Sequence, residues 1–161
     1  MVGKHATALD SASITKINLY ITRYEELYLI DLLGVELFNL FKAALPGSQA
    51  PPPTGIYLDI YDPIREDDGS CIRISRGMKD MILGFLWWEY TRDAKFKQAL
   101  TGIMADKSDN SREVTFDEAN IYSRYNESIA SYDAIQWYIN QHSSDYPDYN
   151  GQYKGIVHWA L

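Results

Sequence analysis

Apolar residues recur every three or four positions along three long stretches of the chain, which is the spacing of amphipathic helices. The first helix is expected to begin at a capping box formed by Thr22 and Glu25 and to end at Pro46-Gly47. Gly34 interrupts this stretch and marks either a kink or the close approach of another backbone. The apolar stripe predicts a core-facing side at positions 27, 30, 33, 37, 40, 41, 44 and 45.

The second helix, expected over residues 76–100 with Ser75 as its N-cap, carries two adjacent tryptophans, Trp87 and Trp88. Neighbouring residues on a helix point about 100° apart, so the two indoles cannot share one narrow apolar stripe. We expect Trp88 to pack in the core and Trp87, flanked by Tyr90, to contact another chain. The inward face is expected to comprise Met78, Met81, Ile82, Phe85, Leu86 and Trp88.

The third helix follows a second capping box, at Thr115 and Glu118, and is expected to run to about residue 143. Its stripe of tyrosine and isoleucine predicts packing at the edge of a core, with a binding surface as the alternative. The stripe is made of Tyr122, Tyr125, Ile129, Tyr132 and Ile139.

The segments around these helices are short of regular patterns. Residues 13–21 alternate roughly between β-branched and polar types, which predicts a short strand or an extended lead-in. The proline-rich segment 47–55 is interpreted as a stiff linker rather than a ligand for an aromatic groove. Residues 56–74 are expected to form two short strands, such as a hairpin, or an irregular excursion. Residues 101–114 are expected to be a long polar loop.

These patterns predict a mainly α protein, a small bundle of about three long helices with a short extended or β-hairpin excursion and an irregular C-terminal tail. Residues 1–161 are expected to form a single domain, with a mobile N-terminus over 1–13 and an extended arm over 143–161. The arm carries large aromatic side chains that need cover, either from their own domain or from a neighbouring subunit. These are Tyr146, Tyr149, Tyr153 and Trp159.

Composition and charge narrow the class of protein. The formal net charge of −7 disfavours broad binding to nucleic acid, because that binding depends on Lys and Arg. The charge is compatible with an acidic surface past which DNA slides without binding. The single cysteine, Cys71, excludes an intrachain disulfide framework. No signal peptide and no run of 18 apolar residues is found, so we expect a soluble protein with no membrane partner.

The sequence offers no assembled catalytic motif. His5, His142 and His158 have no metal-ligand spacing, and Cys71 has no companion for a zinc site. Glu89 is expected to be partly buried and to pair with Arg92 three positions on, as a structural ion pair. The chain is therefore predicted not to be an enzyme, with no catalytic, cofactor-binding or metal site and no cofactor. An enzyme would require Glu89 or His142 in a pocket with a shifted pKa.

Four sequence features together resemble a known family. In order along residues 20–150 they are YLIDLLGVELFNLF, WWEY, a polar loop entered through GIM, and a tyrosine-rich helix followed by YPDY. The combination resembles the small helical head–tail connector proteins of tailed bacteriophages, also called adaptor or neck-ring proteins, including those of crAss-like phages of gut bacteria. The family has no catalytic motif to carry over.

The resemblance implies a structural virion protein, made in the host cytoplasm and placed in the virion neck at the head–tail junction. Such a protein forms a ring, typically of twelve copies, that binds the portal protein and the tail or other neck-ring proteins. Genomic DNA passes through its lumen during genome ejection without specific binding. The predicted interface residues are Trp87, Tyr90, Tyr146, Tyr149, Tyr153 and Trp159. The alternative is a stand-alone helical adaptor or regulatory protein that forms no ring.

Overall fold

The computed structural model describes residues 11–45, 55–67, 69, 71–99, 102–105 and 115–152. The helices in these ranges are α1 (Ser11–Leu33), α2 (Val35–Ala44), α3 (Ile56–Tyr61), α4 (Met78–Lys95) and α5 (Thr115–Gln141). The strands are β1 (Ile64–Asp67), β2 (Ile72–Ser75), β3 (Phe96–Ala99) and β4 (Gly102–Ala105). The expected mainly α bundle with a two-stranded hairpin between helices is confirmed.

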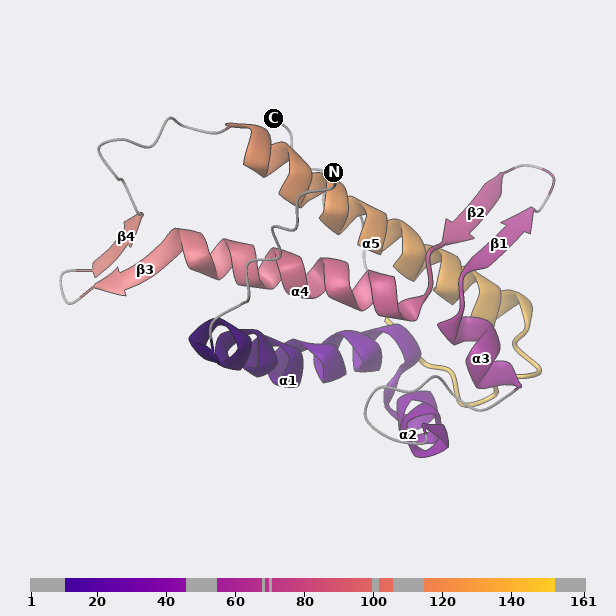
Figure 1. Cartoon of the computed structure of the whole chain (residues 1–161). Coiled ribbons are helices and arrows are strands. Elements are labelled where there is room, and N and C mark those ends of the chain that lie inside the picture. The colour runs from indigo at the N-terminus through magenta and orange to yellow at the C-terminus, as the bar shows by residue number, and fades with distance from the viewer. Residues whose placement is uncertain are drawn as a thin grey trace, which may run out of the picture.

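The long helices α1, α4 and α5 pack side by side, with α4 against both of the others (Figure 1). α2 and α3 lie at the end where α1 and α5 finish and α4 begins, and the β1–β2 hairpin projects from the same end. α4 and α5 approach closely at Gly84, where a Cβ would overlap the Ser128 hydroxyl. The Ser128 hydroxyl donates to Arg124 O within α5 at 3.1 Å, so its polar atom is satisfied in this tight contact.

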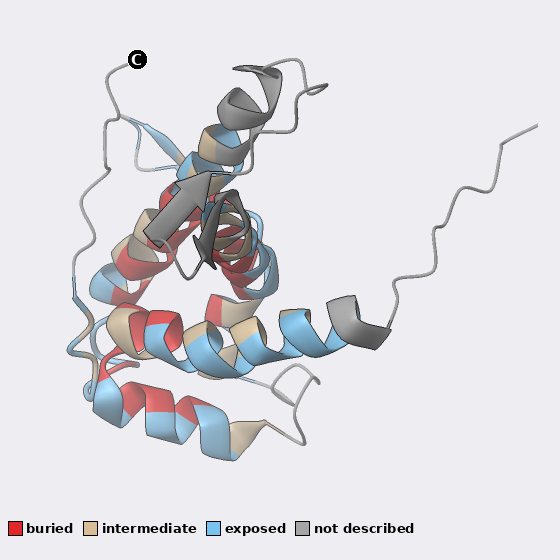
Figure 2. Cartoon of the chain, turned by 90° about the vertical axis from the view of Figure 1, so that its left-hand side faces the viewer, coloured by how far each residue is buried: buried red, intermediate tan, exposed pale blue. Residues whose placement is uncertain are grey.

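The core is aromatic at its centre. Phe85 of α4 stacks on Tyr28 of α1, with ring centroids 4.4 Å apart, and meets Tyr125 and Tyr132 of α5 edge-on. Offset stacks and edge-to-face contacts are the favoured geometries of ring pairs. The buried positions face the space between the helices (Figure 2). The expected inward face of α4 is confirmed for Met78, Met81, Ile82, Phe85 and Leu86.

Gly34 separates α1 from α2. Its two predicted roles, a kink in the chain and the close approach of another backbone, are both confirmed. Its φ of 79° and ψ of 163° belong to a region that is nearly closed to residues with a side chain. A Cβ at Gly34 would also overlap the side chain and backbone of Asn150, whose amide donates to Leu33 O at 3.5 Å. The glycine thus turns the chain between the two helices and makes room for the segment that follows α5.

The predicted start of the first helix is wrong. α1 begins at Ser11, and residues 13–21 are helical rather than extended. Thr22 lies inside the helix, where its hydroxyl donates to Asn18 O at 2.9 Å instead of capping a helix end. Ile14, Ile17 and Ile21 are spaced by three and four positions, so helical spacing outweighs the β-branched preference here. Of the N-terminus predicted to be mobile, residues 1–13, the last three belong to α1, and residues 1–10 lie outside the described residues.

The segment 56–74 begins with the helix α3, which the sequence did not predict, and continues into the expected hairpin. β1 and β2 pair antiparallel, with Ile64 opposite Ser75, and the Gly69 amide donates to Asp67 Oδ1 at 2.9 Å in the turn. Ser75 ends β2; its hydroxyl accepts from the Gly77 amide at 3.0 Å just ahead of α4. Ser75 thus satisfies a donor before the helix without being its N-cap.

The second helix is shorter than predicted. α4 ends at Lys95, and residues 96–99 form β3, paired antiparallel with β4 at the start of the predicted loop. The linker 47–55, apart from its last residue, and loop residues 106–114 lie outside the described residues.

Candidate functional site

The exposed tryptophan of the WWEY motif lies on the surface of α4. Trp87 is 45% exposed, and its ring stacks on Tyr90 with centroids 6.4 Å apart. Tyr90 in turn meets Tyr20 of α1 edge-on at 5.6 Å, and Tyr20 stacks on Tyr24 at 5.8 Å. We call these four residues the aromatic flank. Trp87 thus lies outside the buried face of α4, and its contact with another chain stays a prediction.

Trp88 points in the other direction and packs between helices. Its ring lies 5.3 Å from Tyr122 and 5.0 Å from Tyr125, centroid to centroid, and the residue is half-buried. Tyr132 of the same α5 stripe is completely buried. The tyrosine stripe of the third helix is therefore core packing and its edge, as predicted. Trp88 was predicted to pack in the core; it packs against α5 but stays half-buried, at the edge of the core.

Cationic side chains lie over the rings of the aromatic flank. Lys16 Nζ is 5.2 Å from the centroid of Tyr90, and the guanidinium carbon of Arg124 is 5.9 Å from that of Trp87. The guanidinium carbon of Arg23 is 5.4 Å from the centroid of Tyr24. A cation over a ring face is attracted by the ring quadrupole, by about 0.5–1 kcal/mol at an exposed site. This surface therefore concentrates positive charge in an acidic chain.

A polar network lies beneath the aromatic flank. The Tyr28 hydroxyl donates to Glu89 Oε1 at 2.8 Å, and Arg92 pairs with Glu89 Oε2. Arg92 Nε also pairs with Asp93 Oδ1 at 3.2 Å, and the Tyr20 hydroxyl donates to Asp93 Oδ2 at 2.9 Å. The predicted burial of Glu89 and its pairing with Arg92 are confirmed; Glu89 is 6% exposed.

The environment of this network shifts the pKa of its tyrosines. Burial, followed by the hydrogen bond to Asp93, raises the pKa of Tyr20 to about 12. Burial and the hydrogen bond to Glu89 raise the pKa of Tyr28 well above its ordinary range. Both hydroxyls therefore stay protonated at neutral pH and act as donors. The network joins α1 to α4, and its carboxylates are engaged by partners within the chain.

Glu89 and His142, the residues that an enzyme would require in a pocket, lie far apart on the bundle. His142 follows the end of α5, stacks on Tyr138 with ring centroids 4.2 Å apart, and has Nδ1 2.9 Å from Tyr138 O. It lies at the opposite end of α5 from the helix's contacts with Trp88, near which Glu89 lies. Within the described part of the chain, no group of three or more His, Cys, Asp or Glu side chains could hold a metal ion. Cys71 is exposed.

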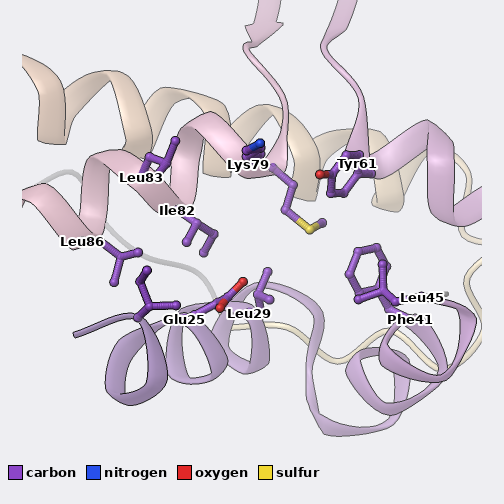
Figure 3. A pocket seen from close by; sticks show the side chains of 11 residues that line it. Glu25, Leu29, Phe41, Leu45, Tyr61, Lys79, Ile82, Leu83 and Leu86 are labelled. Atoms are coloured by element: carbon purple, nitrogen blue, oxygen red, sulfur yellow. The ribbon is translucent and has the colours of Figure 1, made fainter. Parts of the chain in front are cut away.

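An apolar groove of about 340 Å³ runs between α1 and α4 (Figure 3). Ile21, Glu25 and Leu29, spaced four apart on α1, form one wall. Lys79, Ile82, Leu83 and Leu86 of α4 form the other wall. Phe41 of α2, Leu45 just after α2 and Tyr61 of α3 close one end, and Met78 also lines the groove. A volume near 340 Å³ lies at the lower end of the range for ligand pockets.

The groove carries one charged side chain on each wall, Glu25 on α1 and Lys79 on α4. Apolar neighbours desolvate the Glu25 carboxyl and raise its pKa above the ordinary value. Leu83, on the opposite wall, is 45% exposed, whereas Ile82 and Leu86 of the same wall are buried. Leu83 lies one helical turn before Trp87, so the groove opens beside the aromatic flank.

The first part of the predicted C-terminal arm folds back onto its own chain. Tyr146 is 3% exposed, and its hydroxyl donates to Ile56 O at 2.7 Å. Tyr149 is half-buried against the core. The Gln152 amide donates to Asp31 O at 2.7 Å, and Gln152 O accepts from Tyr132 and Gln136. Tyr146 and Tyr149 thus have an intrachain role, whereas Tyr153 and Trp159 lie outside the described residues.

An acidic corner forms at the end of the bundle away from the aromatic flank. Burial is the largest cause of the raised pKa of Tyr138. The carboxylates of Asp59 in α3, Glu66 in β1 and Asp145 after α5 raise this pKa further. Asp59 and Asp145 act on Tyr146 in the same direction. Carboxylates from three separate segments thus surround one part of the surface, and its potential is negative.

Comparisons with known protein families, with curated protein sequences and with solved structures found no match for this chain. The resemblance to phage connector proteins therefore stays a prediction. No helix in the described ranges has the length and apolar content needed to cross a membrane.

Sequence reasoning missed the groove and most of the aromatic flank. Tyr20 was expected in a strand or an extended lead-in and Tyr24 at a helix start, so the ring contacts of Tyr20 with Tyr90 and with Tyr24 were not foreseen. The groove depends on how α1 and α4 cross, which no local pattern encodes. One signal was present: Leu83 is apolar but outside the predicted inward face, which left it without a partner.

Proposed function

We propose that this chain is a structural virion protein, a head–tail connector subunit that forms a ring between portal and tail and surrounds the DNA passage. The proposal starts from the ordered sequence motifs that resemble the connector family. It gains physical support from the distribution of surfaces on the bundle. Catalysis plays no part in it, because the buried carboxylate of the WWEY motif is held in a structural network.

The observation that carries the proposal is the exposed Trp87, which stacks on the half-buried Tyr90; Arg124 lies over the Trp87 ring and Lys16 over the Tyr90 ring. Trp, Tyr and Arg are the residue types most enriched at the energetic centres of protein interfaces. A cyclic ring requires two different lateral surfaces on each subunit. The aromatic flank supplies a cationic surface, and the acidic corner around Asp59 and Asp145 supplies one of opposite sign.

In this proposal the ring holds about twelve copies, as the family resemblance implies, and contacts the portal protein on one side and the tail or other neck proteins on the other. An overall charge of −7 repels DNA and keeps the genome moving through the lumen. No cofactor or metal is needed. The protein is made in the host cytoplasm and ends in the virion neck.

Affinity capture tests this proposal. The tagged chain is recovered from lysate of its native source, and the proteins that accompany it are identified by mass spectrometry. Recovery of portal, tail or other virion proteins supports the connector assignment. Recovery of soluble host proteins with no virion component favours the stand-alone adaptor and contradicts the ring. The size of the pure chain is a weaker test, because a connector subunit can stay monomeric until a portal templates the ring.

A further inference from the structure

The groove between α1 and α4 has the shape of a receptor for an apolar segment. Its α1 wall runs from Ile21 to Leu29, eight residues, which is roughly 12 Å along a helix. Ile82 and Leu86 line the opposite wall, where Leu83 leaves nearly half of its surface in contact with solvent. An apolar groove flanked by an exposed tryptophan is a surface that gains free energy when another apolar group covers it.

The chain itself contains a segment whose sequence fits this groove. After Gln152 it continues as YKGIVHWAL, in which every second residue from Val157 onward is apolar: Val157, Trp159 and Leu161. In an extended segment these three side chains point to one side, and His158 and the small Ala160 point to the other. Four steps of about 3.3 Å separate Val157 from Leu161, so the row spans roughly 13 Å, close to the length of the groove wall.

The exit point of the segment indicates which copy of the groove it reaches. Gln152 is fixed between Asp31 O of α1 and the side chains of Tyr132 and Gln136 on α5. No residue of α5 lines the groove, which opens on α1, α2, α3 and α4.

We propose that the groove between α1 and α4 binds residues 157–161 of a second copy of this chain, with Trp159 at the centre of the contact. The inference rests on the proposed ring, and it assigns the partner of the groove in that ring. The groove opens beside the aromatic flank at Leu83 and Trp87, so the segment extends one continuous interface. Extended segments that place alternate side chains in pockets are a recurring mode of protein recognition.

Photo-cross-linking on the full chain tests the inference. Trp159 is replaced by p-benzoyl-phenylalanine, Trp159→Bpa, which keeps an aromatic side chain at this position. Unlabelled and ¹⁵N-labelled chains are mixed, irradiated both pure and in assemblies captured from the native source, and digested for mass spectrometry. We expect cross-links from position 159 to α1 or α4 residues of the groove, in peptides that pair a light chain with a heavy one.

Two matched variants show whether the groove is the receptor. Leu83→Glu places a charge in the groove wall and is expected to lower the cross-link yield roughly tenfold, because binding of the segment would bury this carboxylate against apolar side chains. Leu19→Glu changes an exposed leucine of α1 that does not line the groove, and is expected to leave the yield unchanged. Equal yields in the two variants overturn the inference.

The outcomes also separate this inference from the connector proposal. Cross-links confined to one chain, or directed outside the groove in every sample, overturn the groove assignment even where virion proteins are captured. Light–heavy cross-links in the groove without any virion partner support the groove assignment and contradict the connector. The two ideas can therefore fail independently.

Discussion

The hydroxyl of Tyr28 on α1 donates to Oε1 of Glu89 on α4 at 2.8 Å, inside the core of the bundle. Glu89 is also paired with Arg92, so a buried charge is compensated from two sides. The Tyr28 ring stacks on Phe85, four residues before Glu89 on the same helix. One side chain thus couples apolar packing to the polar network that lies under the aromatic flank.

Tyr28→Phe is expected to destabilise the fold while leaving its apolar packing intact. The change removes one donor from a buried carboxylate, and the free energy of unfolding should fall by about 1–3 kcal/mol. Urea unfolding followed by circular dichroism measures this loss. Tyr57→Phe is the control, since the described residues include no hydrogen-bond partner for the Tyr57 hydroxyl while its ring packs on Phe41. Equal losses in the two variants would show that the Tyr28–Glu89 bond contributes nothing specific.

Trp87→Ala is expected to weaken assembly more than folding. The indole is 45% exposed and lies on the surface assigned to another chain, so its removal leaves a small cavity at most. Co-recovery of virion proteins in affinity capture should fall severalfold, while the midpoint of urea unfolding changes little. If folding and assembly fall together, the interface role of Trp87 is wrong.

Trp88→Ala supplies the contrast within the same motif. Trp88 packs on Tyr122 and Tyr125, and its truncation should cost roughly 2 kcal/mol of folding stability, somewhat less than a completely buried tryptophan. Urea unfolding measures this loss. A Trp88→Ala variant as stable as the wild type would contradict the packing described for α4 and α5.

Gly34→Ala is expected to disrupt the contact between the α1–α2 junction and the segment after α5. The new Cβ meets both an unfavourable backbone conformation and the atoms of Asn150. Gly55→Ala separates these two effects, because Gly55 has a similar φ of 75° but no atom within 4 Å of an added Cβ. Thermal unfolding should show a loss of about 1–3 kcal/mol for Gly55→Ala and a clearly larger loss for Gly34→Ala. Equal losses would show that the Asn150 segment yields without cost.

The raised pKa of Glu25 predicts a pH-dependent effect on stability. Desolvation makes the folded chain bind this proton more tightly than the unfolded chain does, so stability falls as pH rises from the unfolded pKa, about 4.3, through the folded pKa. Glu25→Gln removes this penalty. Its melting temperature should exceed that of the wild type at pH 7, and the difference should shrink as pH falls towards 4.

Glu26→Gln is the matched control for this pH effect. Glu26 is the neighbour of Glu25 on α1. It forms an exposed ion pair with Lys42 of α2, with 3.5 Å between Nζ and Oε1. Removing an exposed pair of this kind changes stability by about 0–1 kcal/mol, in the destabilising direction. If Glu26→Gln raised the melting temperature at pH 7 as much as Glu25→Gln does, desolvation of Glu25 in the groove would not be the cause of the effect.

The sequence predicted much of the packing where apolar spacing is strong, but not all of it. In the stripe of the first helix, Leu27 and Leu40 were predicted to face the core and are exposed instead. The inward face of α4, the stripe of α5 and the pair formed by Glu89 and Arg92 all follow from three- and four-residue spacing. Gly34 also gave a clear signal, since a glycine inside an apolar helical pattern needs a structural reason.

The errors have a common physical origin in weak local signals. Thr22 and Glu25 match a capping box, but the helical spacing of the preceding isoleucines extends α1 to Ser11. Residues 56–61 are apolar and short, a length at which helix and strand cannot be distinguished by pattern. The aromatic flank and the groove arise only when α1 crosses α4, so they depend on tertiary packing that the sequence does not display.

The central claim, that this chain is a ring-forming connector, is tested most directly by electron microscopy of the assemblies captured with the tagged chain from its native source. The account predicts a rotationally symmetric ring of several copies around an open channel, attached to a portal or to a tail. Single copies bound to soluble proteins, with no symmetric particle, would contradict it.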